Sequence, residues 1–326
     1  MAMIEVEDLT HYFPGSLEPA VDGVSFEVER GKIFGLLGPN GAGKSTIINI
    51  LTTFLQAGAG LVKINGYDAK VKPAWIREMI GVIFQDSTLD ERLTAYENLY
   101  FHAKLYHVPT RELKSRIQKA LEWVNLAERQ HEIIMRYSGG MKRRLEIARG
   151  ILHQPEVLFL DEPTIGLDPQ TRKQIWDFVL GMREKNGLTT FLTTHYLEEA
   201  EICNQVAIID HGKVIAMDTP ANLKQSIGGA VITLRSENTA AVCRIIQESF
   251  KVEVSFEDDE LRVLAPNDAA FLPRLFDKLN GKISAVDVKK TSLEDVFIRL
   301  TGREICAGAS ASPQRLKEVV RSRRLR

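Results

Sequence analysis

The sequence predicts an α/β fold with a mostly parallel sheet, followed by a smaller α+β domain. Short apolar strands alternate with helical patterns as far as about Ser226, which is typical of a parallel sheet covered by helices. Near Ile227–Gly229 the order changes to β-α-β-β-α-β. The 326 residues are too many for one typical compact domain and sufficient for two.

The strands expected in the first domain are short and apolar along their whole length. Strands of a parallel sheet are buried on both faces, so they lack the alternation of an open sheet. A glycine-rich turn leads into a helix from Lys44, and Leu113–Val124 has apolar residues at helical spacing. A tight turn at Asp210–Gly212 leads to a last strand, Lys213–Met217. The apolar strands are Ile33–Gly38, Ile80–Gln85, Val157–Leu160, Thr189–Thr194 and Val206–Asp210.

The second domain is expected to be ferredoxin-like, because two helices are distributed among four strands in the required order. A further helix, Ser292–Leu300, is expected to close it. We therefore divide the chain into residues 1–228, residues 229–303 and a basic, flexible tail at 304–326. The alternative for the tail is an electrostatic contact with anionic lipid or RNA. The elements are Val231–Arg235, Thr239–Glu248, Val252–Phe256, Leu261–Leu264, Asp268–Leu279 and Ile283–Val288.

Composition and charge exclude several classes of protein. The formal net charge is −1, which gives no support to nucleic-acid binding. No apolar run approaches the roughly 18–20 residues needed to cross a bilayer, and the N-terminal segment lacks the basic and apolar regions of a signal peptide. Cys203, Cys243 and Cys306 have no metal-binding spacing, so we expect reduced thiols in a cytosolic protein. Action at a membrane would then require a partner.

A glycine-rich loop after the first apolar strand has the G-x-x-x-x-G-K-[ST] pattern of a phosphate-binding loop. Its glycines allow backbone angles that direct several N–H groups at one anion, and the following helix presents its positive end to the phosphates. Lys44 would contact the β- and γ-phosphates of ATP, and Ser45 would give its hydroxyl to Mg²⁺. The loop consists of Gly38, Pro39, Asn40, Gly41, Ala42, Gly43, Lys44, Ser45 and Thr46.

A second motif is an apolar strand that ends in two acids, Asp161 and Glu162. In phosphate-loop NTPases such an aspartate serves Mg²⁺, so Asp161 is the candidate, and Glu162 is then placed to polarise the attacking water as a general base. Buried paired carboxylates also favour a bound cation. Alone, the motif is equally compatible with an acidic strand end that is capped by a turn at Pro163. Together with the upstream loop, it favours nucleotide hydrolysis.

A third motif narrows the choice among NTPases. A serine followed by two glycines at a helix start forms an anion site of backbone N–H groups and a hydroxyl, with a simple helix cap as the alternative. Ser138, Gly139 and Gly140 have this arrangement, and the basic helix Lys142–Arg149 follows. The segment resembles the signature motif of ATP-binding cassette (ABC) proteins, and so does its position shortly before the carboxylate strand. The resemblance to this family covers about residues 3–226.

Further residues follow in the family's order, and the resemblance implies a role for each. Gln85 resembles the glutamine that senses the γ-phosphate and Mg²⁺, and His195 resembles the switch histidine at the γ-phosphate. Asp168 ends a Gly-Leu-Asp segment that resembles the loop crossing the dimer interface. Tyr12 lies where the family has an aromatic residue that stacks on adenine, although neighbouring Phe13 could take this role. Each residue alone has a plain structural explanation, and it is their joint order that indicates the family.

Two positions depart from the commoner pattern, because Met141 replaces a glutamine and Ile165 replaces a small residue. The region Val231–Arg303 resembles the C-terminal domain of the daunorubicin-resistance type of ABC ATPase, with the best local matches at Thr291–Phe297 and Leu300–Arg303. ATPases of this branch work with separate permease chains that export drugs, lipids or polysaccharides.

The family resemblance implies a homodimer in which two subunits enclose two ATP molecules with Mg²⁺. Each ATP would lie between the phosphate loop of one subunit and Ser138–Gly140 of the other, and closure would bring Glu162 and His195 to the γ-phosphate. The chain would power an integral membrane permease from the cytoplasmic face of the membrane, with no specific nucleic acid as partner. The alternatives are a soluble ABC ATPase acting on ribosomes or DNA, and a sensor that hardly hydrolyses ATP. The single cassette argues against the first, and intact Glu162 and His195 argue against the second.

Overall fold

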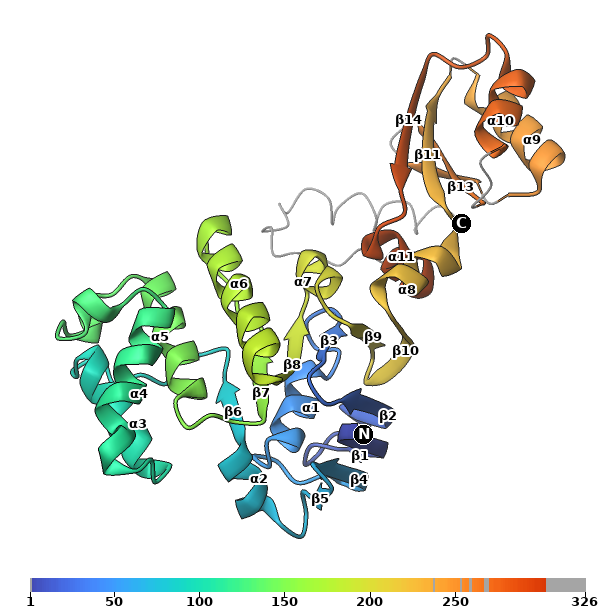
Figure 1. Cartoon of the computed structure of the whole chain (residues 1–326). Coiled ribbons are helices and arrows are strands. Elements are labelled where there is room, and N and C mark those ends of the chain that lie inside the picture. The colour runs from blue at the N-terminus through green and yellow to red at the C-terminus, as the bar shows by residue number, and fades with distance from the viewer. Residues whose placement is uncertain (1, 237, 253, 258–259, 267–269, 303–326) are drawn as a thin grey trace.

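A six-stranded sheet forms the centre of the first part of the chain, in the order β10–β9–β3–β8–β7–β6 (Figure 1). The computed structural model describes residues 2–302 apart from 237, 253, 258–259 and 267–269. Neighbouring strands from β9 to β6 pair in parallel, and β10 pairs antiparallel with β9, so the predicted fold class is confirmed. The strands are β3 (Ile33–Leu37), β6 (Ile80–Ile83), β7 (Val157–Asp161), β8 (Thr189–Thr194), β9 (Gln205–Asp210) and β10 (Lys213–Asp218).

One strand is shorter than the sequence predicts. We expected a strand to continue to Gln85, but β6 ends at Ile83. The carbonyl oxygen of Phe84 accepts a hydrogen bond from the side chain of Arg143 and leaves the sheet. Gln85 therefore belongs to an exposed loop that follows the strand.

A second, antiparallel sheet has the order β2–β1–β4–β5 and packs on the parallel sheet. Buried and exposed residues alternate along much of β2, so one face of this sheet is buried. Phe26 stacks on Phe34 and Phe191 of the parallel sheet, with ring centroids 5.0 and 5.7 Å away. The elements are β1 (Ala2–His11), β2 (Val21–Glu29), α1 (Lys44–Leu51), β4 (Ala59–Ile64), β5 (Tyr67–Asp68) and α2 (Pro73–Met79).

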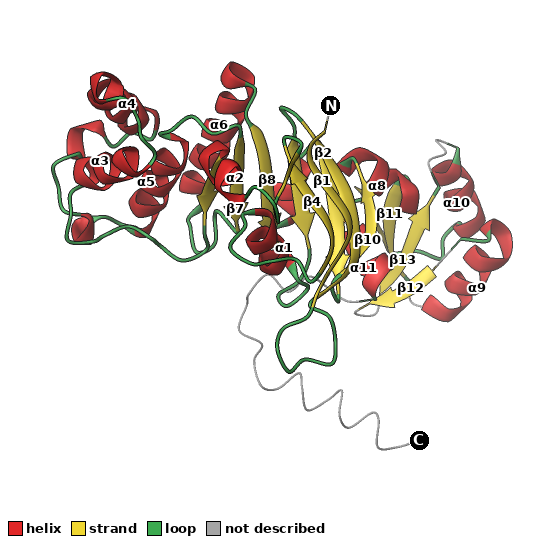
Figure 2. Cartoon of the chain, turned by 90° about the horizontal axis from the view of Figure 1, so that it is seen from below, coloured by secondary structure: helices red, strands yellow, loops and turns green. Residues whose placement is uncertain are grey.

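Three helices form an arm beside the edge strand β6 (Figure 1), and Figure 2 shows the same three helices gathered at one end of the molecule. They share an apolar core of their own, to which the predicted helix contributes buried Leu113, Ile117 and Leu121. A capping box of Thr94 and Glu97 fixes the start of the first helix. The helices are α3 (Ala95–Leu105), α4 (Thr110–Trp123) and α5 (Gly139–Ile151), with short 3-10 turns at Ala127–Arg129 and Ile134–Arg136. Against the parallel sheet lie α6 (Pro169–Asn186) and α7 (Leu197–Glu201).

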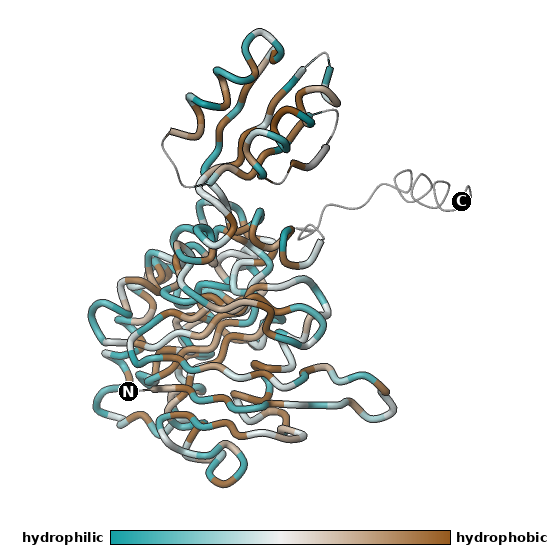
Figure 3. The backbone as a smooth tube through the Cα atoms, turned by 90° about the vertical axis from the view of Figure 1, so that its right-hand side faces the viewer, coloured by the Kyte–Doolittle hydropathy of each residue, from teal (hydrophilic) through white to brown (hydrophobic). Residues whose placement is uncertain are grey.

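The C-terminal part of the chain forms a separate lobe that a narrow connection joins to the rest (Figure 3). Its antiparallel sheet has the order β12–β13–β11–β14, which is the ferredoxin-like arrangement that the sequence predicts. β14 begins at Ala285, two residues later than expected at Ile283. The elements are β11 (Ala230–Arg235), α9 (Thr239–Phe250), β12 (Val254–Glu257), β13 (Glu260–Ala265), α10 (Phe271–Leu279) and β14 (Ala285–Lys290).

The last described helix returns to the first part of the chain. We expected this helix to close the C-terminal domain, but α11 (Leu293–Thr301) packs against α7 and α8 (Pro220–Ile227). Its buried Leu293 and Phe297 share an apolar core with Leu223 of α8. The apolar face of α11 therefore completes the core beneath the parallel sheet. The predicted tail at 304–326 lies outside the described residues.

Candidate nucleotide-binding and catalytic site

Three segments of the predicted site leave the same edge of the parallel sheet. Leu37 is paired with Thr194, and Asp161 is paired with Thr193. The residues that follow β3, β7 and β8 therefore emerge side by side. Ligands of open α/β sheets bind outside the carboxyl ends of the strands, which is where these segments meet.

The backbone of the predicted phosphate loop requires glycine at two places. A Cβ atom on Gly38 would lie 2.4 Å from the carbonyl oxygen of Ile209. Gly43 has a φ of 102°, and a Cβ atom there would lie 2.5 Å from the carbonyl oxygen of Ala20. At these two positions the loop thus passes too close to neighbouring backbone for any side chain. Between β3 and α1 it comprises Gly38, Pro39, Asn40, Gly41, Ala42 and Gly43, and Lys44, Ser45 and Thr46 form the first turn of α1.

Lys44 lies at the centre of the predicted site and is buried, with 5% of its surface exposed. Its Nζ atom donates hydrogen bonds to the carbonyl oxygens of Gly38 at 2.8 Å and Pro39 at 3.1 Å. The same atom lies 3.1 Å from Oε1 of Glu162. The ammonium group therefore joins the phosphate loop to the predicted general base.

Asp161 ends β7 beside two hydroxyl groups. Ser45 Oγ donates to Asp161 Oδ1 at 3.3 Å, and Thr193 Oγ1 donates to the same oxygen at 2.5 Å. Carboxylate and hydroxyl oxygens are ligands that Mg²⁺ accepts, usually together with substrate phosphates. The donor atoms of Asp161 and Ser45 therefore fit such an ion.

Glu162 has a left-handed backbone conformation, with a φ of 45°. This conformation is uncommon for residues other than glycine and persists where the surroundings enforce it. Its N–H donates to Thr193 Oγ1 at 3.1 Å, and its Oε2 atom lies 3.2 Å from Nδ1 of His195. Burial by itself would raise the pKa of Glu162, but the His195 ring and the Lys44 ammonium outweigh it and lower that pKa. The carboxylate is thus held in its charged, proton-accepting form.

The signature segment lies at the start of α5 in the helical arm, whereas Lys44 begins α1, a helix outside that arm (Figure 1). Ser138 is the exposed N-cap of α5, and its Oγ accepts a hydrogen bond from Met141 N–H at 3.3 Å. A Cβ atom on Gly139 would meet nothing within 4 Å, whereas one on Gly140 would lie 3.0 Å from Thr171 Cγ2. The structure does not bring Ser138 to the phosphate loop of its own chain.

The remaining predicted residues lie at exposed places around this edge. Asp168 caps α6, where its Oδ1 accepts from Thr171 N–H at 2.9 Å. The Thr171 hydroxyl and N–H lower the pKa of Asp168. Gln85 is exposed in the loop after β6. Tyr12 and neighbouring Phe13 are 52% and 46% exposed, so exposure does not decide between them.

The structure shows buried polar residues at the site that the sequence analysis did not single out. The Thr193 hydroxyl donates a hydrogen bond to Asp161 and accepts one from the Glu162 N–H. The only sequence signal for this role is its position near the end of a predicted strand. Glu199 is buried and accepts a hydrogen bond from Thr164; burial raises the pKa of Glu199. Arg143 and Glu146 form a buried ion pair within α5. Their i,i+3 spacing was visible in the sequence, but not the side of the helix that faces the site.

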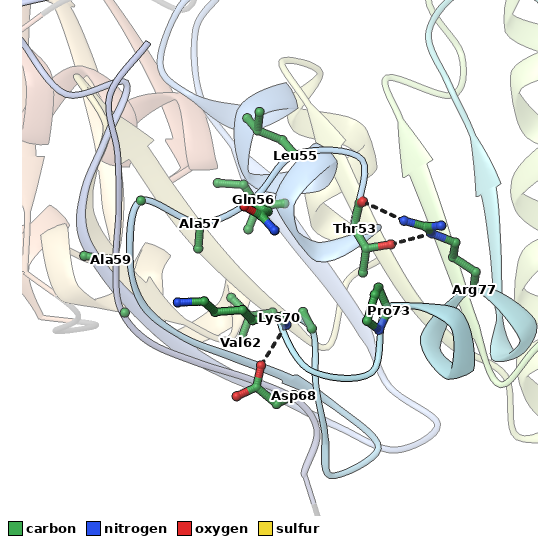
Figure 4. A pocket seen from close by; sticks show the side chains of 14 residues that line it. Thr53, Leu55, Gln56, Ala57, Ala59, Val62, Asp68, Lys70, Pro73 and Arg77 are labelled. Carbon is green, nitrogen blue, oxygen red and sulfur yellow. Dashed lines mark hydrogen bonds between the residues drawn. The ribbon is translucent and has the colours of Figure 1, made fainter. Parts of the chain in front are cut away.

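A separate pocket of about 220 Å³ lies between the loop after α1 and the loop after β5 (Figure 4). Arg77 Nε donates to Thr53 Oγ1 at 2.9 Å on one side, and Asp68 accepts from Lys70 N–H at 2.7 Å on the other. The residues that line this pocket include none of those predicted to bind nucleotide. We therefore assign it no part in ATP chemistry.

Comparison with known families agrees with this geometry. Residues 21–165 match the model described as ABC transporter. Residues 219–301 match the model described as the C-terminal domain of the DrrA1-3-like ATP-binding protein. The second match begins at Thr219 and so includes α8 as well as α11. Among the helices that the structure describes, none is both long and apolar enough to span a membrane.

Individual relatives extend the match over most of the chain. The daunorubicin/doxorubicin resistance ATP-binding protein DrrA of Streptomyces peucetius is 36% identical over 307 residues, which is 92% of each protein. The linearmycin resistance ATP-binding protein LnrL of Bacillus subtilis is 37% identical over 296 residues, which is 87% of this chain and 94% of that protein. A solved dimeric structure of MJ0796, a bacterial ABC transporter cassette, superposes with a TM-score of 0.62 at 25% identity, over 67% of this chain and 98% of that one.

These relatives are ATP-binding proteins of resistance and transport, and none supports the alternative of a soluble factor acting on ribosomes or DNA. The chain has their fold, and its Lys44, Asp161 and Glu162 stand together at the edge where nucleotide binds in such folds. The chain belongs to the ATP-binding subunits of ABC transporters of the exporter type, which are ATPases, and it carries the DrrA-like C-terminal region.

Proposed function

We propose that two copies of this chain bind and hydrolyse ATP with Mg²⁺ to drive a separate membrane permease that exports a drug, lipid or polysaccharide. The observation that carries the chemical part is the buried contact of Glu162 with both Lys44 and His195. This contact supports the proposal that Glu162 acts as a charged base beside the lysine of the phosphate loop. The export direction rests on relatives named for resistance to daunorubicin, doxorubicin and linearmycin.

In this proposal the phosphate loop receives the β- and γ-phosphates. Lys44 exchanges the carbonyl oxygens of Gly38 and Pro39 for phosphate oxygens, and the backbone N–H groups at the start of α1 bind the same anion. Ser45, Asp161 and Gln85 would hold Mg²⁺, which neutralises charge on the phosphates when bound. Tyr12, or Phe13 beside it, would stack on adenine.

Glu162 would orient and deprotonate the attacking water, because its carboxylate is charged and fixed at the sheet edge. His195 would contact the γ-phosphate and keep Glu162 in place. When ATP takes up the charge of Lys44, the Glu162 carboxylate is released toward the water. His195 would keep the carboxylate oriented after Lys44 has turned to the phosphates, and a base that is already oriented lowers the barrier.

The second half of the nucleotide site would come from another subunit. Ser138 and Gly139 are exposed and Gly140 is half-buried at the N-terminus of α5, where backbone N–H groups and a hydroxyl can bind a γ-phosphate. Asp168 lies in the loop proposed to cross the interface. The dimeric cassette among the similar structures supports this arrangement.

The permease contact and the place of action are also part of the proposal. A chain without a spanning helix among its described residues would reach the cytoplasmic face of the membrane through the permease. We propose the division of the chain at residue 228, between α8 and β11, with the C-terminal lobe as an accessory domain. No specific nucleic-acid partner is proposed.

The test is affinity purification of the tagged chain from detergent-solubilised membranes of its host, with mass spectrometry of the proteins that co-purify. We expect one polytopic membrane protein in stoichiometric amount and ATPase activity in the purified complex. Ribosomal or nucleic-acid proteins in its place, without a membrane protein, would contradict the transport role. ATPase activity of the isolated chain is measured in parallel, so that the chemical and transport parts are tested separately.

A further inference from the structure

Arg143 and Glu146 place two opposite charges in the interior of the protein, behind the predicted catalytic residues. Their side chains are 8% and 4% exposed, and Arg143 Nη1 lies 3.0 Å from Glu146 Oε2. A buried ion pair contributes little to stability unless every donor and acceptor is satisfied. A buried ion pair can instead hold neighbouring groups in position, and the other hydrogen bonds of Arg143 and Glu146 test this hypothesis.

The guanidinium group of Arg143 holds the end of the catalytic strand through its main chain. Nε donates to the carbonyl oxygen of Pro163 at 2.7 Å. Nη2 donates to the carbonyl oxygens of Asp161 at 3.2 Å and Glu162 at 3.4 Å. Three consecutive carbonyl groups thus depend on one side chain. Since Glu162 has a φ of 45°, these bonds help to enforce a backbone conformation that would otherwise relax.

The same ion pair holds the loop that contains Gln85. Arg143 Nη1 donates to the carbonyl oxygen of Phe84, and Glu146 Oε1 accepts from Thr88 N–H at 2.9 Å. Arg149, one further turn along α5, donates to the carbonyl oxygen of Thr88 at 2.7 Å. Both ends of the loop are therefore fixed to a single helix.

The acceptors account for the whole donor capacity of the guanidinium. It has five N–H groups in a rigid plane, and five acceptor oxygens surround it. Lysine offers three donors from one point and cannot reach acceptors that are spread around the edge of this plane. The arrangement therefore specifies arginine and not merely a positive charge.

We propose that Arg143, oriented by Glu146, is a positioning residue for ATP hydrolysis. It makes α5 a rigid link between Ser138 at the start of the helix, Glu162 and the loop of Gln85. A shift of α5 when Ser138 engages nucleotide then moves the base and the Gln85 loop together. This inference rests on the proposed roles of Glu162 and Gln85.

The test compares Arg143→Lys with Arg144→Lys in the full chain. Arg144 is the next residue of α5 and donates to the carbonyl oxygen of Val124 within the helical arm, so the same substitution there is a matched control. For Arg143→Lys we expect kcat to fall by about 10-fold or more, because a misplaced base slows the reaction. The KM for ATP and the affinity for a fluorescent ATP analogue should change by less than about 2-fold, because Lys44 is untouched. Arg144→Lys should retain its kcat.

Three outcomes would overturn the proposal. The first is an Arg143→Lys protein with the kcat of the wild type. The second is an equal loss of kcat in both arginine variants, which indicates a general effect on α5. The third is a loss of ATP affinity in Arg143→Lys that by itself explains the whole fall in its ATPase activity. Melting temperatures are measured for each variant, and activity is normalised to folded protein.

A second variant decides the matter if Arg143→Lys does not fold. Glu146→Gln keeps the shape of the side chain and an oxygen for hydrogen bonding but removes the charge that orients Arg143. We expect it to lower kcat by about 3-fold at unchanged ATP affinity, and unchanged kcat would overturn the proposal. Glu162→Gln, measured alongside, separates the proposed base from the proposed positioning residue. Continued turnover by Glu162→Gln would show that Glu162 is not the base. Loss of turnover in Glu162→Gln, with normal turnover in Arg143→Lys and Glu146→Gln, would contradict only the positioning role of Arg143.

Discussion

The carboxyl edge of the parallel sheet and the start of α5 differ in how much of a nucleotide site one chain completes. At the sheet edge Lys44, Glu162 and His195 are at most 6% exposed, and Glu162 contacts the other two. At the start of α5, Ser138 and Gly139 are exposed, and Gly139 has open space around it. The groups at the sheet edge are held by one another without a bound nucleotide, whereas the N–H groups and the hydroxyl at the start of α5 are exposed at the surface. If the proposed composite site exists, one chain assembles the catalytic groups, and a second subunit supplies the contact that starts hydrolysis.

The strongest way to break this comparison is to remove the proposed base. Glu162→Gln should lower ATP turnover by about 10²–10⁴-fold, because the amide cannot accept the proton of water. ATP binding should persist, and a dimer with bound ATP should accumulate in size-exclusion chromatography with light scattering. The matched control is Glu156→Gln, just before the opposite end of the same strand, which should retain turnover. Unchanged hydrolysis by Glu162→Gln would show that another group is the base.

Removing the lysine tests whether the ordered edge is the phosphate site. Lys44→Ala should weaken ATP binding by about 100-fold, because a buried charged contact with phosphate is lost. Isothermal titration or a fluorescent nucleotide measures the affinity. Lys70→Ala changes a lysine of the pocket in Figure 4 and should leave affinity unchanged. Equal affinities for both variants would place the phosphates elsewhere.

Mixed dimers sharpen the contrast between the ordered and the open region. A Ser138→Arg subunit with a Lys44→Ala subunit should retain at most one usable composite site, so activity should be about half that of the wild type or less. Each variant alone should be nearly inactive, which serves as the control. Full activity of the mixture would contradict a site shared between subunits.

The smallest expected effect concerns pH and tests why the ordered edge is stable. The pKa of Glu162 is lowered below 4.5 in the folded chain, because His195 and Lys44 outweigh its burial. A lowered carboxylate pKa stabilises the fold above the unfolded value, and this stability is lost as pH falls through the folded one. The melting temperature of the wild type should therefore fall more steeply than that of Glu162→Gln as the pH is lowered below about 5. Parallel curves for the two proteins would contradict this ionic contribution.

The short-range pattern of the sequence determined much of the fold and the composition of the site. Apolar strands and helical spacing predicted β3, β7, β8, β9 and α4 to within a residue or a few, because burial on both faces leaves a continuous apolar run. The phosphate loop was predictable because its glycines serve backbone geometry that side chains would prevent, as at Gly38 and Gly43. Asp161 and Glu162 were singled out as two acids at the end of an apolar strand, and only the upstream phosphate loop favoured a nucleotide role over a plain strand end.

Only the tertiary structure decided which distant groups meet. Glu162 contacts Lys44 and His195, and Arg143 binds three carbonyl groups. These contacts depend on how separate strands and helices pack together. The same is true of α11. Its sequence shows an apolar face but not which part of the chain that face contacts, and only the structure shows that it packs against α7 and α8. A sequence pattern determines which side of an element is apolar, because that follows from a local period. It does not determine the neighbour across that side, because long-range packing is set by the complementary shape of all elements together.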